Sequence, residues 1–197
     1  MTDRARTGWE SSFSEFREAQ PKRIRERLVA FVRDPSPEQI RSWDDAIPPL
    51  QAEVSKALFR DELARHYSAI LEYELPMESR RPDVFLLVGA GVMVIELKGK
   101  LYPTQADLDQ ASAYARDLRN YHRECDGREV PPVLVPTRAQ GYQQFVDGVH
   151  VTGPDALDEL IARITNARES RLSSARRFCR RTPTARCRRW SRPRVSS

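Results

Sequence analysis

The chain has 197 residues, enough for one domain of ordinary size, and 40% of them are hydrophobic, as in a globular protein. No apolar run is long enough to cross a bilayer and the N-terminus lacks the apolar stretch of a signal peptide, so we expect a cytoplasmic protein with no membrane span. The three cysteines and three histidines form no cluster, which argues against a disulfide framework and against structural zinc.

The net charge of +5 is concentrated at the C-terminal end. From Arg163 onward the chain has 12 arginines, no lysine and a single acid, Glu169, which amounts to about +11. Residues 1–162 keep 21 basic and 27 acidic side chains and therefore a net charge of about −6. The basic pI of about 9.4 is thus no evidence that the folded part binds a polyanion through bulk charge.

Helices are expected in the N-terminal third. Residues 9–33 have apolar side chains at helical spacing among many charges, and Pro35 and Pro37 end this segment. A second helix is expected over about 48–66, because apolar residues recur there three and four positions apart.

The hydrophobic period then changes from 3.6 to 2, which predicts three strands at residues 69–75, 82–88 and 92–98. A polar turn at 77–81 separates the first two strands, and the glycine-rich segment 89–91 is a strong turn signal between the second and the third. The third strand is almost continuously apolar, as expected of a strand that is buried on both faces.

A helix is expected next over about 104–124, and its first residue and Asp107 have the spacing of a capping box. A short buried strand follows at 133–136, a further strand at 145–151 and an amphipathic helix at 154–164. This order of elements predicts an α/β (α+β) protein with a central mixed β-sheet flanked by helices.

The segment after about Thr165 is rich in Arg, Ser and Pro and nearly free of acids. It cannot bury enough apolar surface to offset chain entropy, so residues 166–197 are expected to be disordered. Two interpretations are open, an arginine-rich arm that binds nucleic acid and a non-native extension produced by out-of-frame translation. The expected organisation is an N-terminal helical extension (1–41), a central domain (42–165) and this tail.

The candidate functional site consists of Asp83 on the second strand and of Glu96 and Lys98 on the third. Hydrolysis of a phosphodiester needs a divalent cation to offset charge on the phosphoryl oxygens, carboxylates to hold the cation, and a group that positions or deprotonates water. Two acids and a lysine that meet at one point satisfy these needs. A salt-bridged strand end is the competing structural interpretation.

A hairpin would bring these residues together. If the two strands turn about Ala90, paired residues have numbers that sum to about 179 to 181, and an odd sum places Asp83 on the same sheet face as Glu96 and Lys98. The charges interrupt an apolar strand, where an ionised group is costly unless it is paired or binds a metal. The chain has only four lysines, so a lysine at this position is unlikely to be filler.

The pattern Pro82-Asp83…Glu96-Leu97-Lys98, followed by Gln110-x-x-x-Tyr114, resembles the PD-(D/E)XK phosphodiesterase superfamily, whose fold is restriction-endonuclease-like. The resemblance implies that Asp83, Glu96 and the backbone carbonyl of Leu97 would hold Mg²⁺ or Mn²⁺. Lys98 would orient or activate the attacking water.

The resemblance also implies that Gln110 and Tyr114 support the phosphate or the lysine. A further upstream acid is usual in the superfamily, and three residues qualify. Glu53 lies on the preceding helix, whereas Glu72 and Glu74 lie on the first strand, where a turn would place either of them across from the hairpin.

Longer stretches of the sequence, at 71–76, 80–83, 114–118 and 132–136, are similar to one branch of the superfamily. That branch is the nuclease-like domain that precedes a helicase-type ATPase in bacterial Schlafen-like proteins, and the similarity covers about residues 42–165. Because this chain has no P-loop motif, it resembles a stand-alone or truncated version, and a helicase or ATPase partner is implied.

The leading hypothesis is a magnesium-dependent nuclease that acts on DNA or RNA, alone or as a module of a larger defence, repair or restriction machine. One alternative is a non-catalytic nucleic-acid-binding or adaptor domain with the same fold, which the acidic body favours. Another is a gene remnant, which the tail favours. The sequence does not indicate the oligomeric state.

Overall fold

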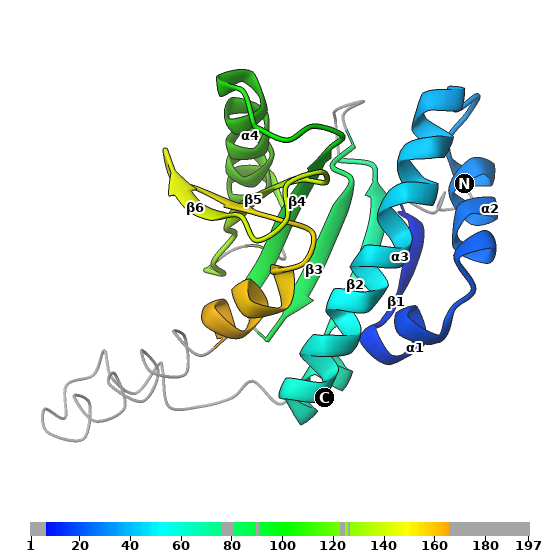
Figure 1. The fold of residues 1–197 in the computed structure, drawn as a ribbon, viewed down its shortest axis with the longest axis horizontal. Helices are drawn as coiled ribbons and strands as arrows, with labels where there is room; N and C mark the ends of the chain where they lie inside the picture. The colour runs from blue at the N-terminus through cyan, green and yellow to red at the C-terminus, as the bar shows by residue number, and fades with distance from the viewer. Residues whose placement is uncertain (1–6, 76–80, 90, 123–124, 126, 166–197) are drawn as a thin grey trace, which may run out of the picture. The chain divides into compact units, whose positions relative to one another are not determined.

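The computed structural model describes residues 7–75, 81–89, 91–122, 125 and 127–165 (Figure 1). Residues 1–162 cluster as one compact unit and residues 163–197 as a second, and the expected disorder of 166–197 lies outside the described residues. The elements are β1 (Thr7–Ser12), α1 (Phe13–Glu18), α2 (Pro21–Phe31), α3 (Pro37–Arg60), the 3₁₀ helix η1 (Glu62–His66), β2 (Ser68–Tyr73), β3 (Val84–Val88), β4 (Gly91–Lys98), α4 (Gln105–Tyr121), β5 (Pro132–Pro136), β6 (Gln143–Val146), β7 (Val149–Thr152) and a helix at 157–165.

The strands form one seven-stranded sheet in the order β1-β2-β3-β4-β5-β7-β6. The pairs β4–β5 and β5–β7 are parallel and the other pairs are antiparallel. The expected mixed sheet flanked by helices is therefore confirmed, whereas the restriction-endonuclease-like fold stays a prediction. Among the residues that the structure describes, no helix is long and apolar enough to cross a membrane.

Helices cover both faces of the sheet (Figure 1). On one face α4 contributes Tyr114 to a core that contains Phe85 and Val94, and on the other face Leu50 of α3 and Leu97 of β4 line the same cleft. Burial on both sides explains why β4 is apolar at almost every position. The two polar side chains at its end therefore stand out as exceptions.

The expected helix over residues 9–33 is wrong at its start. Residues 9–12 belong to β1, in which Trp9 pairs with Leu71 of β2, and the helical part is divided into α1 and α2. Ser12 ends the strand because its Oγ accepts a hydrogen bond from the Glu15 amide at 3.2 Å and so caps α1. Periodicity does not reveal such a strand, because it is stabilised by pairing with residues 56 to 66 positions away.

The second helix also differs from the expectation. α3 begins at Pro37 rather than at Pro48, with Ser36 as its cap, and it ends at Arg60. It therefore passes through Pro48 and Pro49 and through the expected boundary between residues 41 and 42. Pro48 and Pro49 remove two N–H donors from the helix, but the burial of its apolar side chains outweighs this loss. The buried side chains, which pack against the sheet, α1 and α2, include Trp43, Ile47, Leu50 and Val54.

The strand expected at 145–151 is two strands. Asp147 and Gly148 have φ angles of 50° and 81°, as the two central residues of a type I′ turn require, and they join β6 to β7 as a tight hairpin. The remaining strands and helices lie within three residues of their predicted ends (β2, β3, β4, α4, β5 and the helix at 157–165).

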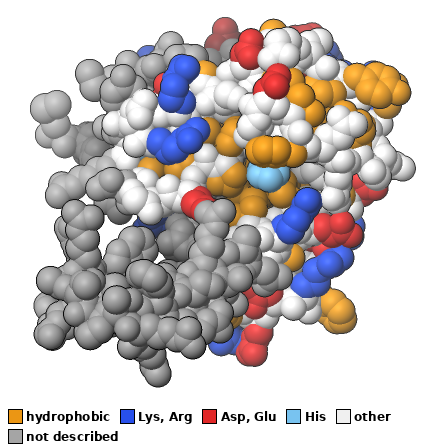
Figure 2. Space-filling view, turned by 90° about the vertical axis from the view of Figure 1, so that its left-hand side faces the viewer, with side chains coloured by type: hydrophobic (Ala, Val, Ile, Leu, Met, Phe, Trp, Pro, Cys, Tyr) orange, Lys and Arg blue, Asp and Glu red, His pale blue; other side chains and the backbone are white. Residues whose placement is uncertain are grey.

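β6 is an edge strand and exposes apolar surface. Phe145 is 66% exposed, and its ring centroid lies 4.7 Å from that of His150 on β7. Figure 2, which faces the β6 side of the molecule, shows hydrophobic side chains gathered around a histidine on this surface. The two edges of the sheet therefore differ, because β1 at the opposite edge has its tryptophan buried.

The loop after β7 depends on a glycine. The Gly153 amide donates to the Tyr142 carbonyl at 2.7 Å, and a β-carbon at this position would collide with the carbonyl oxygen of Ala139. We expect Gly153→Ala to lower the free energy of unfolding by about 1–3 kcal/mol, measured by urea denaturation. Gly99→Ala is the matched control, because nothing lies within 4 Å of its β-carbon position, and equal stability of the two variants would contradict this packing.

Candidate metal centre

The β3–β4 hairpin has the register that places the candidate residues together. Val84 pairs with Ile95 and Val88 with Gly91, so paired numbers sum to 179 and Asp83 follows on opposite Glu96. The Asp83 Oδ2 atom accepts a hydrogen bond from the Leu97 amide at 2.8 Å. The predicted hairpin, with paired numbers that give an odd sum, is confirmed.

Side chains from β4 and α4 continue this cluster on the α4 face. The Glu96 Oε1 atom accepts hydrogen bonds from Lys98 Nζ and from Gln110 Nε2, each at 2.8 Å. Gln110 also accepts from Lys98 Nζ at 3.1 Å and donates to the Tyr114 hydroxyl at 3.2 Å. The structure therefore brings together all four side chains, two from each element, that the sequence placed beside Asp83.

The second oxygen of Glu96 is free. Glu96 is only 5% exposed, yet its Oε2 atom has no hydrogen-bond partner among the residues that the structure describes. A buried carboxylate oxygen without a donor is costly, and a cation would satisfy it. Because Glu96 lies across the hairpin from Asp83 and its charge acts on that residue, this oxygen is the observation that fits a metal ion to the site.

The electrostatics of the pair point the same way. Burial, followed by the charge of Glu96, raises the pKa of Asp83 well above its ordinary value. Burial also raises the pKa of Glu96, although the hydrogen bond from Lys98 opposes the shift. Two carboxylates that resist ionisation side by side gain from a bound cation, which removes both the repulsion and the desolvation penalty.

Lys98 keeps its charge. Burial alone would lower its pKa, but the hydrogen bond to Glu96 and the charges of Glu96 and Asp83 outweigh burial and raise it. The side chain is therefore an ammonium group that donates hydrogen bonds and does not accept a proton in this arrangement. Lys98 is therefore better suited to orienting water or phosphate than to removing a proton from water.

Among the three candidates for an additional acid, Glu72 is the one that acts on the pair. Its negative charge contributes to the raised pKa of both Asp83 and Glu96. Its backbone amide donates to the Asp83 carbonyl at 3.0 Å, so the strands lie side by side as expected. The carboxylate itself turns to α3, where Trp43 Nε1 donates to it at 2.8 Å, and Arg81 lies 3.4 Å away.

The backbone of Glu72 explains this turn. Its φ of 54° lies in the left-handed region, which is uncommon outside glycine and disrupts the regular alternation of side chains along β2. Gly8 on β1 makes room for the distortion, since a β-carbon there would lie 3.2 Å from the Glu72 β-carbon. Strained residues cluster at functional sites, and the amide of this one bonds to the carbonyl of Asp83.

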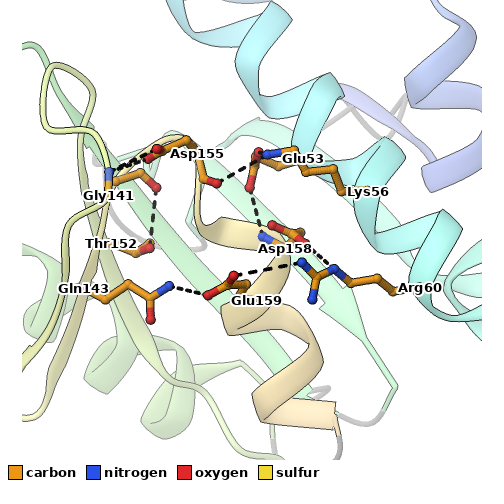
Figure 3. Close-up of polar contacts among 10 residues, drawn as sticks. Glu53, Lys56, Arg60, Gly141, Gln143, Thr152, Asp155, Asp158 and Glu159 are labelled. Carbon is orange, nitrogen blue, oxygen red and sulfur yellow. Dashed lines mark hydrogen bonds and ion pairs between the residues drawn. The ribbon is translucent and has the colours of Figure 1, made fainter.

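Glu53 has a structural role instead. Lys56 Nζ donates to its Oε1 at 2.6 Å, and the Asp158 amide donates to its Oε2 at 3.1 Å (Figure 3). Arg60 on the same helix pairs with Asp158 at 2.6 Å, so this network fastens α3 to the helix at 157–165. The third candidate, Glu74, lies one residue beyond β2 and is half-buried.

The donor set of the site is small. In the described part of the chain, no three His, Cys, Asp or Glu side chains form a metal-binding group. The N–H and C=O of one extended residue point to the same neighbouring strand, so the Leu97 carbonyl is directed to the side on which its amide meets Asp83. Two carboxylates, one carbonyl and water suit Mg²⁺, which keeps several waters when it binds proteins.

Sequence reasoning missed the residues around Glu72. Trp43 lies 29 positions away, in the part of α3 that the sequence pattern did not predict as this helix, and no local pattern joins the two residues. Arg81 was a visible signal, because it directly precedes the Pro82-Asp83 motif. Its position beside Asp83 could have indicated an ion pair between Arg81 and an upstream carboxylate.

Comparison with known proteins adds no relative: no protein-family model, curated protein or solved structure matches this chain. The chemistry of the site therefore has to be judged from its own contacts.

A capping interaction fixes the start of α4, and with it the position of Gln110. The Asp107 Oδ2 atom accepts from the Thr104 amide at 2.8 Å, from its hydroxyl at 2.7 Å and from Lys100 Nζ at 2.7 Å. Burial would raise the pKa of Asp107, but the hydrogen bonds from Lys100 and Thr104 outweigh it and lower the pKa to about 2. The predicted pairing of Asp107 with Thr104 is confirmed.

Asp107 should therefore stabilise the protein in a pH-dependent way. A depressed folded-state pKa contributes stability that is present above the unfolded value of 3.8 and is lost as the pH falls toward 2. We expect Asp107→Asn to lower the free energy of unfolding by about 1–2 kcal/mol at pH 7, allowing for the half-exposed Lys100. Urea denaturation should show the difference shrinking below about pH 4, and a constant difference down to pH 3 would contradict this.

The carboxylate pair should make stability depend on metal. We expect Mg²⁺ to raise the melting temperature of the wild type by mass action, with the gain growing as the logarithm of its concentration. Asp83→Asn and Glu96→Gln should each remove most of that gain, and in EDTA each should be at least as stable as the wild type because the repulsion is relieved. Differential scanning fluorimetry decides this, and the same destabilisation with and without Mg²⁺ would identify a structural salt bridge.

Proposed function

We propose that this chain is a metal-dependent nuclease, which hydrolyses phosphodiester bonds of DNA or RNA with Mg²⁺ or Mn²⁺ bound at Asp83 and Glu96. The observation that carries the proposal is the buried, unpartnered Oε2 atom of Glu96 beside a second carboxylate and a charged lysine. The resemblance of these residues to the PD-(D/E)XK pattern supports it. Bound metal would supply positive charge that offsets the charge on the phosphoryl oxygens and acidifies water.

Each residue of the cluster has a distinct task in this proposal. Asp83 and Glu96, with the carbonyl of Leu97, hold the cation. Lys98, an ammonium group tethered by Glu96, donates hydrogen bonds to the attacking water or to a phosphoryl oxygen, where negative charge develops. Gln110 holds the Lys98 ammonium and the Glu96 carboxylate in fixed positions, so that neither has to reorganise when substrate arrives.

A second candidate function is a nucleic-acid-binding or adaptor domain without catalysis. The contact between Lys98 Nζ and Glu96 Oε1 at 2.8 Å favours it, because such an ion pair is also what a purely structural cluster would contain. The same two residues thus serve both hypotheses. Activity, and not stability alone, has to separate them.

The test is cleavage of single- and double-stranded DNA and RNA by the purified chain in Mg²⁺, Mn²⁺ or EDTA. We expect cleavage with either metal and none in EDTA. Asp83→Asn and Glu96→Gln should each reduce the rate by at least about 100-fold, because each removes a ligand of the metal that offsets charge in the transition state. Lys98→Ala should reduce the rate comparably and leave the metal-dependent rise in melting temperature intact.

Asp109→Asn is the matched control, because this carboxylate lies on the same helix as Gln110 but is exposed. It should cleave at the wild-type rate. A wild type that cuts no substrate in either metal, or a Glu96→Gln variant that cuts as fast as Asp109→Asn, would refute the nuclease and leave the adaptor.

A further inference from the structure

The loop between β4 and α4 presents apolar side chains to solvent directly beyond the candidate metal centre. Tyr102 is 72% exposed and Leu101 is 53% exposed. Lys98 precedes Tyr102 by four residues, which span at most about 14 Å even when fully extended. The backbone of Tyr102 therefore lies no further than this from that of Lys98, a separation that a bound oligonucleotide can span.

The loop is held in place although its side chains are exposed. Lys98, at the end of β4, accepts through its carbonyl from the Lys100 amide at 2.7 Å and from the Thr137 amide at 2.8 Å. The Lys100 carbonyl accepts from the Arg138 amide at 3.3 Å, and its ammonium is held by Asp107 at 2.7 Å. These contacts fix the backbone that carries Tyr102, so the loop would lose little conformational entropy when a ligand binds.

A basic side chain lies next to this loop. Arg138 is exposed, and its guanidinium has no ion pair or hydrogen bond among the residues for which the structure gives contacts. Its backbone contact with Lys100 brings it beside the segment that carries Tyr102. An exposed aromatic ring together with an unengaged arginine is the combination that binds an unpaired nucleotide, the ring by stacking on the base and the arginine by contact with the phosphate.

We propose that Tyr102, assisted by Arg138, stacks on an unpaired base of the substrate, so that the protein acts on single-stranded or locally unpaired nucleic acid. This inference rests on the proposed nuclease function and assigns its substrate class. A base inside a duplex has both faces covered by its neighbours and cannot stack on a side chain. The acidic charge of residues 1–162 agrees, because these residues offer little bulk attraction to the dense phosphates of a duplex.

The test measures binding of fluorescent oligothymidylate and of a duplex to the full chain in EDTA, where no cleavage is expected. Tyr102→Ala should weaken single-strand binding by roughly 5- to 100-fold, the range found for the loss of one stacked base, and should leave duplex binding unchanged. Tyr102→Phe should bind like the wild type, because it keeps the ring. Phe59→Ala is the matched control, since Phe59 is an aromatic residue on α3 that is 93% exposed.

An oligonucleotide with abasic residues separates stacking from other effects. It should bind the wild type as weakly as oligothymidylate binds Tyr102→Ala, and Tyr102→Ala should weaken its binding no further, because the partner of the ring is already absent. The loss caused by Tyr102→Ala should be the same at low and high salt, whereas Arg138→Ala should reduce the salt dependence by about one phosphate contact. The Arg-rich segment after Thr165 is present in every variant, so its contribution cancels.

Two outcomes overturn the inference. One is a Tyr102→Ala variant that binds the single strand like the wild type, and the other is one that loses as much affinity for the abasic strand as for the intact strand. Cleavage assays in Mg²⁺ keep this apart from the proposed function. Metal-dependent cleavage without an effect of Tyr102 removes only the stacking role, whereas stacking without any cleavage removes only the nuclease.

Discussion

The candidate site depends on the register of one hairpin. Because β3 and β4 pair with residue numbers that sum to 179, Asp83 lies opposite Glu96, and Lys98 follows on the same face under α4. A slip of one residue would place Asp83 on the opposite sheet face from Glu96 and Lys98, because strand side chains alternate between faces. The pairing that continues to Val88 and Gly91 and the apolar packing of β4 on both faces hold this register.

Burial of the pair creates an imbalance that the rest of the site only partly corrects. Glu72, Asp83 and Glu96 bring three carboxylates to neighbouring strand ends, against the two cations of Lys98 and Arg81. Lys98 reaches only one oxygen of Glu96, and Arg81 is paired with Glu72 on the side of α3. The remaining negative charge has to be offset either by protonation or by a further cation. The raised pKa values of Asp83 and Glu96 mean that both residues bind a proton more readily than usual.

Local signals in the sequence were sufficient for the hairpin and for α4, because the alternation of β3 and β4, the glycine turn and the Asp107 cap all act within a few residues. Long-range features were not accessible in this way. β1 exists only by pairing with β2, and α3 continues through two prolines because its apolar face is buried. The Asp147-Gly148 turn was a local signal that could have divided the last predicted strand. The left-handed backbone of Glu72 could not have been foreseen, because nothing in the adjacent residues requires it.

The contacts of Asp83 bear most directly on whether the cluster is structural or chemical. A salt bridge between Lys98 and Glu96 would be complete without a second acid, and the bond from the Leu97 amide could equally be accepted by an asparagine or a serine. Compared with these residues, a carboxylate at this position adds a negative charge next to that of Glu96, and the raised pKa of Asp83 shows that this charge is unfavourable there. A second acid that adds repulsion next to Glu96, together with a Glu96 oxygen that has no partner, is better explained by a cation that both carboxylates could hold than by the needs of the fold.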